Sequence, residues 1–136
     1  MGDANGKGKD MVTREEYEIL VNLVVEDLAE KGYDFSDVDI TVSNRRTTRR
    51  LGTTWAHENR IILYHQVPGN TLDLAEDNIR HELAHILAWV RNPMDPVHHG
   101  LEWKAACLDL GANPKTINDH DGVVKYLSAA NVRAWA

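Results

Sequence analysis

The segment with the most specific chemistry is His81-Glu82-Leu83-Ala84-His85, which has the pattern His-Glu-x-x-His. Side chains four residues apart on a helix project from one face, so both imidazoles can bind the same zinc ion. Glu82 lies beside them around the helix, where it can reach a water molecule on that metal. By chance, roughly 0.02 such matches are expected in a chain of this composition. The pattern therefore predicts a metal site of the kind found in zinc hydrolases.

A helix must carry this motif, and the sequence predicts one from Leu72 to about Val90, capped by Asn70 or Thr71. With His81 placed at 0°, His85 falls at about 40° and Glu82 at about 100° around the helix. Apolar residues occupy the arc between about 140° and 240°: Ile79, Leu83, Ile86, Leu87 and Val90. We therefore expect the apolar side to pack on the core and the His/Glu side to face a cleft. The alternative is a solvated helix face that carries two histidines.

Catalytic zinc needs a third protein ligand and an open position for water. Five residues that follow the motif helix in the sequence are candidates for that ligand: Asp95, His98, His99, Glu102 and Asp109. A metzincin would have glycine at position 88 and histidine at position 91, and the chain has Ala88 and Arg91 there. Thermolysin-type enzymes use a glutamate on a following helix, which keeps Glu102 open.

The elements around the motif follow from capping residues and periodicity. Five further segments have the pattern of a helix or a strand: helices at 14–31 and 101–110, and strands at 38–42, 51–56 and 60–65. This order predicts an α+β fold, with an N-terminal helix, a three-stranded and mainly antiparallel sheet, the motif helix and a following helix that carries the third-ligand region. Residues 1–12 are expected to be a disordered tail, and residues 13–136 a single domain.

Composition excludes several classes of protein. Among 136 residues Cys107 is the only cysteine, so an intramolecular disulfide and a multi-cysteine zinc ribbon are excluded. No apolar run approaches the length of a membrane span, and the first ten residues lack the apolar stretch of a signal peptide. We therefore expect an intracellular, cytoplasmic protein without a membrane partner. The net charge of −6 excludes nucleic-acid binding through bulk charge, but it does not exclude a local basic patch.

Such a patch is present at Arg45, Arg46, Arg49 and Arg50, in the expected hairpin turn between two strands. These arginines are candidates for contact with substrate or with DNA phosphates, and the alternative is a solvated turn. Three residues on or near the third strand are candidates for oxyanion stabilisation: His57, Tyr64 and His65. The strand 60–65 itself is expected to take an extended peptide by strand addition.

Two groups of residues carry a family resemblance. HELAH is followed, after about a dozen residues, by His98-His99-Gly100-Leu101-Glu102-Trp103, and this combination resembles the SprT-like (Spartan-type) metalloprotease domain. Upstream, Asn44-Arg45-Arg46, Leu51-Gly52 and Ile61-Ile62-Leu63 also resemble that family, so the similarity covers about residues 40–112. The resemblance implies a small zincin-like fold and one Zn²⁺ ion held by His81, His85 and His99. It also implies that Glu82 is the catalytic acid and base, and it leaves His98 at the rim as a candidate substrate contact.

The resemblance further implies a zinc-dependent metallopeptidase that hydrolyses peptide bonds of protein substrates, including DNA-bound or DNA-crosslinked proteins, in a DNA-repair role. Weak DNA binding would then involve the arginine cluster. One alternative is a regulatory protease that cleaves a specific partner such as a repressor. Another is a catalytically inactive, zinc-stabilised binding module. Glu82 discriminates between the classes, since a binding module has no need of a general base beside its ligands.

Overall fold

The computed structural model describes residues 11–48, 50–93 and 100–114. It contains the three helices α2 (Arg14–Glu30), α3 (Leu72–Arg91) and α4 (Leu101–Leu110), the three strands β1 (Asp39–Arg46), β2 (Gly52–Trp55) and β3 (Arg60–Gln66), and the short 3₁₀ turn η1 (Ala56–Glu58). The predicted α+β class is confirmed, and the helix limits differ from the expected ones by one residue at most. Strand β1 extends beyond the expected limit through four polar residues, which carry no alternating apolar signal.

Helix α2 begins where its sequence predicts. The Thr13 hydroxyl accepts a hydrogen bond from the Glu16 N–H at 3.0 Å, and the Glu16 carboxylate accepts one from the Thr13 N–H at 2.9 Å. This reciprocal capping box satisfies two backbone donors that the helix itself leaves unpaired. The chain before it is already packed at Val12, which is buried and donates its N–H to the Asn70 carbonyl. The expectation of a disordered tail over residues 1–12 is therefore wrong at Val12, and residues 1–10 lie outside the described residues.

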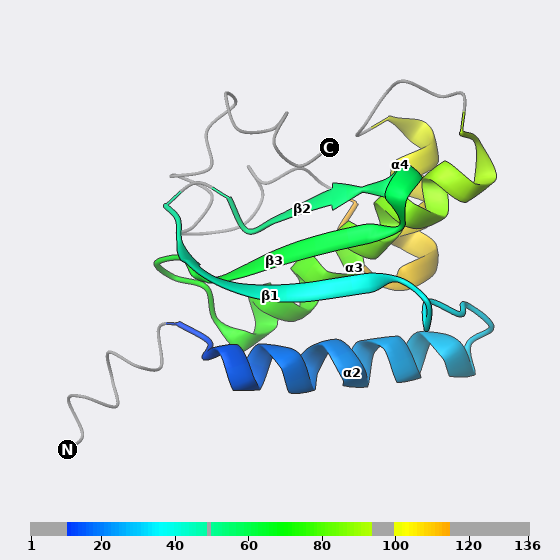
Figure 1. The fold of residues 1–136 in the computed structure, drawn as a ribbon. Helices are drawn as coiled ribbons and strands as arrows, with labels where there is room; N and C mark the ends of the chain where they lie inside the picture. Colours follow the sequence, from blue (N-terminus) through cyan, green and yellow to red (C-terminus); the bar gives the residue numbers. More distant parts are fainter. Residues whose placement is uncertain (1–10, 49, 94–99, 115–136) are drawn as a thin grey trace, which may run out of the picture.

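The sheet has the strand order β1-β3-β2 (Figure 1). Strand β2 runs antiparallel to β3, whereas β1 runs parallel to it, so the sheet is mixed and not mainly antiparallel as expected. Strand β3 carries the buried Ile61 and Leu63, and its apolar content explains why it occupies the centre. Residues 47–51 consequently cross from one edge of the sheet to the other. The expected hairpin turn at the arginine cluster is wrong, because β1 and β2 are not neighbours.

Helix α3 is the central helix of the fold. It packs against β2 and β3 of the sheet, against α2 and against α4 (Figure 1). Arg80 ties these helices together: its guanidinium donates to Asp27 of α2 at 3.1 Å and to the Leu110 carbonyl of α4 at 2.9 Å. Because α3 has neighbours on several sides, its middle turns lie inside the molecule. Within the described residues, no helix combines the length and apolar character that a membrane span requires.

Candidate metal centre

The His-Glu-x-x-His segment lies in the middle of α3, which begins at its N-cap Thr71. His81, Glu82 and His85 are 2%, 0% and 6% exposed. The expectation that this side of the helix faces a cleft is therefore wrong for the described residues. The sheet covers the glutamate side, and α4 covers the histidine side. Conversely Val90, expected in the core stripe, is exposed near the end of α3.

The two histidines lie on one face of α3, as their spacing predicts. Their ring centroids are 5.2 Å apart, with an interplanar angle of 70°. Trp103 of α4 contacts both: its ring lies 4.7 Å from that of His81 and stacks on that of His85 at 5.6 Å. The Trp103 indole N–H also donates to the His81 carbonyl at 3.4 Å. Trp103 therefore limits the orientations of both imidazoles.

Glu82 lies on the other side of the motif, against β2. Its Oε1 accepts a hydrogen bond from the Thr54 hydroxyl at 2.5 Å, and the same hydroxyl lies 3.4 Å from the Glu82 carbonyl. Burial raises the pKa of Glu82 to about 8, and the Thr54 hydrogen bond opposes that rise. Thr54 was not identified from the sequence, because a threonine in a short strand carries no chemical signal of its own.

A second buried contact fixes α3 one turn before Glu82. The Asn78 amide donates to the Tyr17 hydroxyl of α2 at 3.0 Å and to the Leu51 carbonyl, just before β2, at 3.2 Å. Burial raises the pKa of Tyr17 well above its ordinary value, so the phenol is neutral at physiological pH. This network joins α2, α3 and the start of β2. It sets the distance between the motif helix and the strand that contacts Glu82.

The third ligand cannot be placed in the same way. His98, His99 and Asp95 lie outside the described residues, and among the described residues no three His, Cys, Asp or Glu side chains converge as a metal site. Of the other candidates, Asp109 pairs with Arg91 at 2.6 Å, and Glu102 is partly buried in the first turn of α4. Two neighbouring imidazoles beside a buried carboxylate nevertheless fit zinc, which takes nitrogen ligands in tetrahedral sites. His81 and His85 are thus the described residues that could hold the ion.

The arginine cluster begins on β1, which is the edge of the sheet opposite β2. Arg45 and Arg46 are exposed near and at the end of β1, whereas Arg49 lies outside the described residues. Arg50 is half-buried, and its carbonyl accepts a hydrogen bond from the Thr47 hydroxyl at 2.6 Å. Of the described arginines, Arg45 and Arg46 thus lie on β1, and Arg50 lies on the segment that crosses from β1 to β2.

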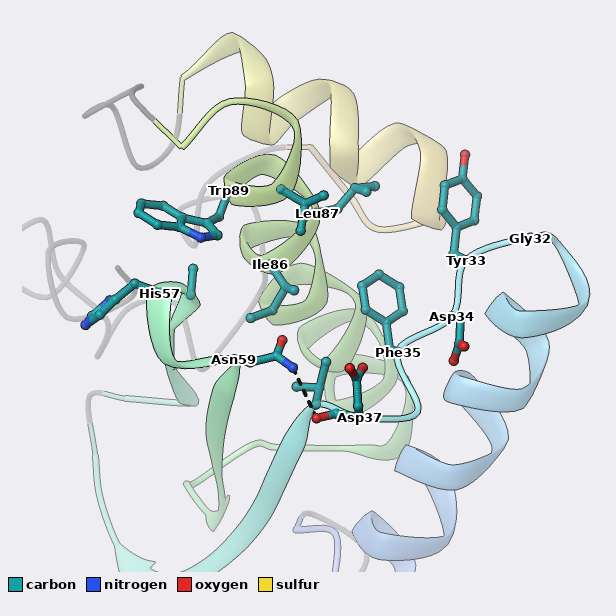
Figure 2. A pocket seen from close by; sticks show the side chains of 13 residues that line it. Gly32, Tyr33, Asp34, Phe35, Asp37, His57, Asn59, Ile86, Leu87 and Trp89 are labelled. Atoms are coloured by element: carbon teal, nitrogen blue, oxygen red, sulfur yellow. Dashed lines mark hydrogen bonds between the residues drawn. The ribbon is translucent and has the colours of Figure 1, made fainter.

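The contacts described for the three oxyanion candidates are with residues other than those of the His-Glu-x-x-His motif. The His65 ring nitrogens lie 3.2 Å from the Val12 carbonyl and 3.1 Å from the Asn44 side-chain oxygen, and Tyr64 is buried. His57 is exposed, and its ring lies 6.3 Å from that of Trp89. Figure 2 shows both rings at one end of a cavity of about 530 Å³. The cavity is lined by residues 32–35, 37 and 38, by the segment after β2 and by the last turns of α3. Of the predicted metal ligands that the structure describes, neither His81 nor His85 lines this cavity.

The comparison with protein families assigns the chain. The family model described as the SprT-like family matches residues 20–121, well over half of the sequence. The chain belongs to the SprT-like family. The match includes the sheet, α3 and α4, and therefore both Thr54 and Trp103, which contact the motif. Membership indicates a zincin-like domain of metallopeptidase type. No curated protein and no solved structure matched the chain.

Proposed function

We propose that this SprT-like protein is a zinc-dependent metallopeptidase that hydrolyses peptide bonds of protein substrates. The observation that carries the proposal is the arrangement in one stretch of α3. Two imidazoles there lie 5.2 Å apart against Trp103, and the carboxylate between them in sequence lies against Thr54. A helix that served packing alone would have apolar side chains at these buried positions.

His81 and His85, with His99 as the third ligand, would hold one Zn²⁺ ion. When bound, the ion supplies Lewis-acid chemistry: it lowers the pKa of a water molecule and polarises the scissile carbonyl. The chain's own contribution is to prepare the ligands. Trp103 restricts both rings, so that less orientational freedom is lost when the ligands engage a metal.

Glu82 would move the proton. As a water oxygen bonds to the carbonyl carbon, the carboxylate accepts a proton from that water. It then gives the proton to the amide nitrogen while the carbon–nitrogen bond breaks, so the products are a carboxylic acid and an amine. Its Oε2 is suited to this step, because among the described residues that oxygen has no hydrogen-bond partner.

Strand β2 is the best candidate for seating the substrate. The expectation that residues 60–65 take a peptide by strand addition is wrong, because β3 is hydrogen-bonded on both sides, to β1 and to β2. Within the described part of the sheet β2 is paired along one edge only. An extended peptide could add to its other edge through main-chain hydrogen bonds, with little side-chain selectivity. Such a site suits unfolded or flexible polypeptide, including protein crosslinked to DNA.

The test is cleavage of casein and of histone by the zinc-loaded protein, with and without single-stranded DNA. Glu82→Gln should bind zinc and fold normally, yet lose about a hundredfold or more of the cleavage rate, because the amide cannot act as a base. Glu26→Gln is the matched control, since Glu26 is exposed on α2 and should have no effect. Full cleavage by Glu82→Gln would contradict the mechanism. Stoichiometric zinc without any cleavage by the wild type would favour the binding module.

A further inference from the structure

The Glu82 carboxylate has two oxygens in different surroundings. Oε1 accepts the 2.5 Å hydrogen bond from the Thr54 hydroxyl, and both residues are buried. When Glu82 is ionised, this hydrogen bond is stronger than one between neutral groups, because the acceptor then carries charge and water does not compete. Oε2 has no partner among the described residues. The carboxylate is thus hydrogen-bonded at one oxygen, and its other oxygen is buried without a hydrogen-bond partner among the described residues.

Gly52, two residues before Thr54 on β2, borders the second oxygen. A Cβ atom at position 52 would lie 3.2 Å from Oε2 and 3.2 Å from Cγ of Glu82, closer than side chains ordinarily approach. It would also lie 3.3 Å from the Asn78 amide, which is itself held by Tyr17 and Leu51. Both neighbours are held by hydrogen bonds, Glu82 by Thr54 and Asn78 by Tyr17 and Leu51. The absence of a side chain at Gly52 therefore keeps the space beside Oε2 that the carboxylate occupies.

We propose that Thr54 is a positioning residue for the peptidase reaction: its hydroxyl fixes Glu82 through Oε1 and directs Oε2 to the proton transfer, while Gly52 leaves the room for it. This inference rests on the proposed function. Side chains along a strand point alternately to its two faces. Residues 52 and 54 face α3, whereas the backbone edge of β2 is the one proposed for the substrate. One short strand thus positions both the general base and the peptide.

The first experiment compares steady-state kinetics of Thr54→Val, Thr54→Ser and Thr53→Val with those of the zinc-loaded wild type on one unfolded substrate. Thr54→Val should lower kcat about tenfold or more, because a misplaced catalytic group loses its alignment. KM and zinc content should stay within twofold, since the substrate edge and the ligands are untouched. Thr54→Ser retains the hydroxyl and should recover most of kcat. Thr53→Val, on the opposite face of the same strand, should match the wild type.

A structural role alone predicts another pattern, in which KM rises and the melting temperature falls for Thr54→Val while serine fails to rescue. That pattern would overturn the proposal, as would a kcat for Thr54→Val within twofold of the wild type. Gly52→Ala is an independent variant. It should lower kcat with zinc retained, because the added methyl group displaces the carboxylate; an unchanged kcat would count against the role of the space beside Oε2.

A second measurement does not depend on activity. In zinc-free protein, the unfolding free energies of Thr54→Val, Glu82→Met and the double variant form a thermodynamic cycle. The two changes should be strongly non-additive, because either one removes the same hydrogen bond, whereas Thr53→Val and Glu82→Met should be additive. If the effects of Thr54→Val and Glu82→Met on the free energy of unfolding were additive, the inference would be overturned. If the wild type proves to lack peptidase activity while this coupling is present, the proposed function fails and the contact between Thr54 and Glu82 stands.

Discussion

Helices α2 and α3 are similar in length and begin at the same kind of threonine cap, yet they bury different kinds of residue. Helix α2 buries one stripe at helical spacing, made of Tyr17, Val21, Val24 and Leu28. Its outer side is exposed even where it is apolar: Ile19 is 60% and Leu23 is 56% exposed. This is the pattern of a helix that covers a core from one side.

Helix α3 is buried on several sides, and four of its buried residues are polar: Asn78, His81, Glu82 and His85. Burying a polar group is unfavourable unless its partners compensate, and apolar residues would stabilise the same positions more simply. Asn78 has a structural explanation, since it joins α2 to the start of β2. For the two histidines and the glutamate, a metal-dependent reaction is the explanation that the comparison with α2 favours.

The strongest test of this explanation for the buried polar residues of α3 is to remove the predicted third zinc ligand. His99→Ala should lose both bound zinc and peptidase activity, because two imidazoles alone hold zinc weakly. His98→Ala is the matched control and should keep its zinc, since neighbouring side chains point in different directions. Metal analysis after dialysis and a casein assay measure both outcomes. If His98→Ala loses zinc and His99→Ala keeps it, the family alignment is displaced by one residue. If both variants keep zinc, Glu102 or Asp95 becomes the third ligand.

The next effect concerns stability. Zinc should raise the melting temperature, because the ion binds the folded ligand set and scarcely the unfolded chain. At a free zinc concentration a thousandfold above Kd, the gain is about 4 kcal/mol. His85→Ala should lose most of it, whereas His57→Ala should retain it, because His57 is exposed beside Trp89. Scanning calorimetry with zinc and with EDTA measures the difference. If the wild type melts at the same temperature with zinc and with EDTA, the prediction of a zinc site at the buried histidines is contradicted.

Local signals in the sequence predicted the elements well. The capping box at Thr13 and Glu16 fixed the start of α2, and alternation in residues 38–42 identified β1. The motif spacing placed His81 and His85 on one face of α3. Each of these features depends on residues a few positions apart, which is why the sequence alone was sufficient.

The pairing of strands and the burial of the motif side chains depend on residues far apart in the sequence, and both were predicted less well. The position of β3 between β1 and β2 follows from competition among strands for the centre of the sheet, which periodicity does not report. The helical wheel placed Glu82 toward a cleft, but Thr54, 28 residues earlier, covers it. Likewise Trp103 covers the histidines from α4. A wheel describes one helix and contains no information about which elements lie against its polar side.

A direct comparison of the two helices uses one leucine from each. Leu83→Ala should lower the free energy of unfolding of the zinc-free protein by about 3 kcal/mol, because Leu83 is fully buried and leaves a cavity. Leu23→Ala should change it by no more than about 0.5 kcal/mol, since Leu23 is exposed on α2. Urea titrations followed by circular dichroism measure both. Similar losses from the two variants would contradict the assignment of α3 as the buried helix.

The smallest expected effect belongs to the arginine cluster, whose described members Arg45 and Arg46 are exposed. If burial of polar residues marks the reaction centre, changes in this exposed cluster should weaken DNA binding and leave the rate of peptide hydrolysis unchanged. Changing Arg45, Arg46, Arg49 and Arg50 together to glutamine should weaken single-stranded DNA binding. The slope of log affinity against log salt should fall by at most about 3, since each phosphate contact contributes about 0.7. The net charge of −6 repels DNA as a whole, so the wild-type affinity itself should be weak.

Fluorescence anisotropy at low and moderate ionic strength measures this slope, and a matched variant separates local contact from overall charge. Arg14 and Lys104 lie on helices and Lys31 caps the end of α2, all outside the cluster. Changing these three to glutamine removes three positive charges, against four in the cluster variant. If that variant loses as much affinity as the cluster variant, the effect is one of bulk charge. If the wild type has no salt-sensitive affinity at low ionic strength, the cluster is a solvated segment, and proteins crosslinked to DNA are no longer the favoured substrates. Casein cleavage by the cluster variant should equal that of the wild type in either case, because the described contact of the Glu82 side chain is with Thr54 and involves none of these arginines.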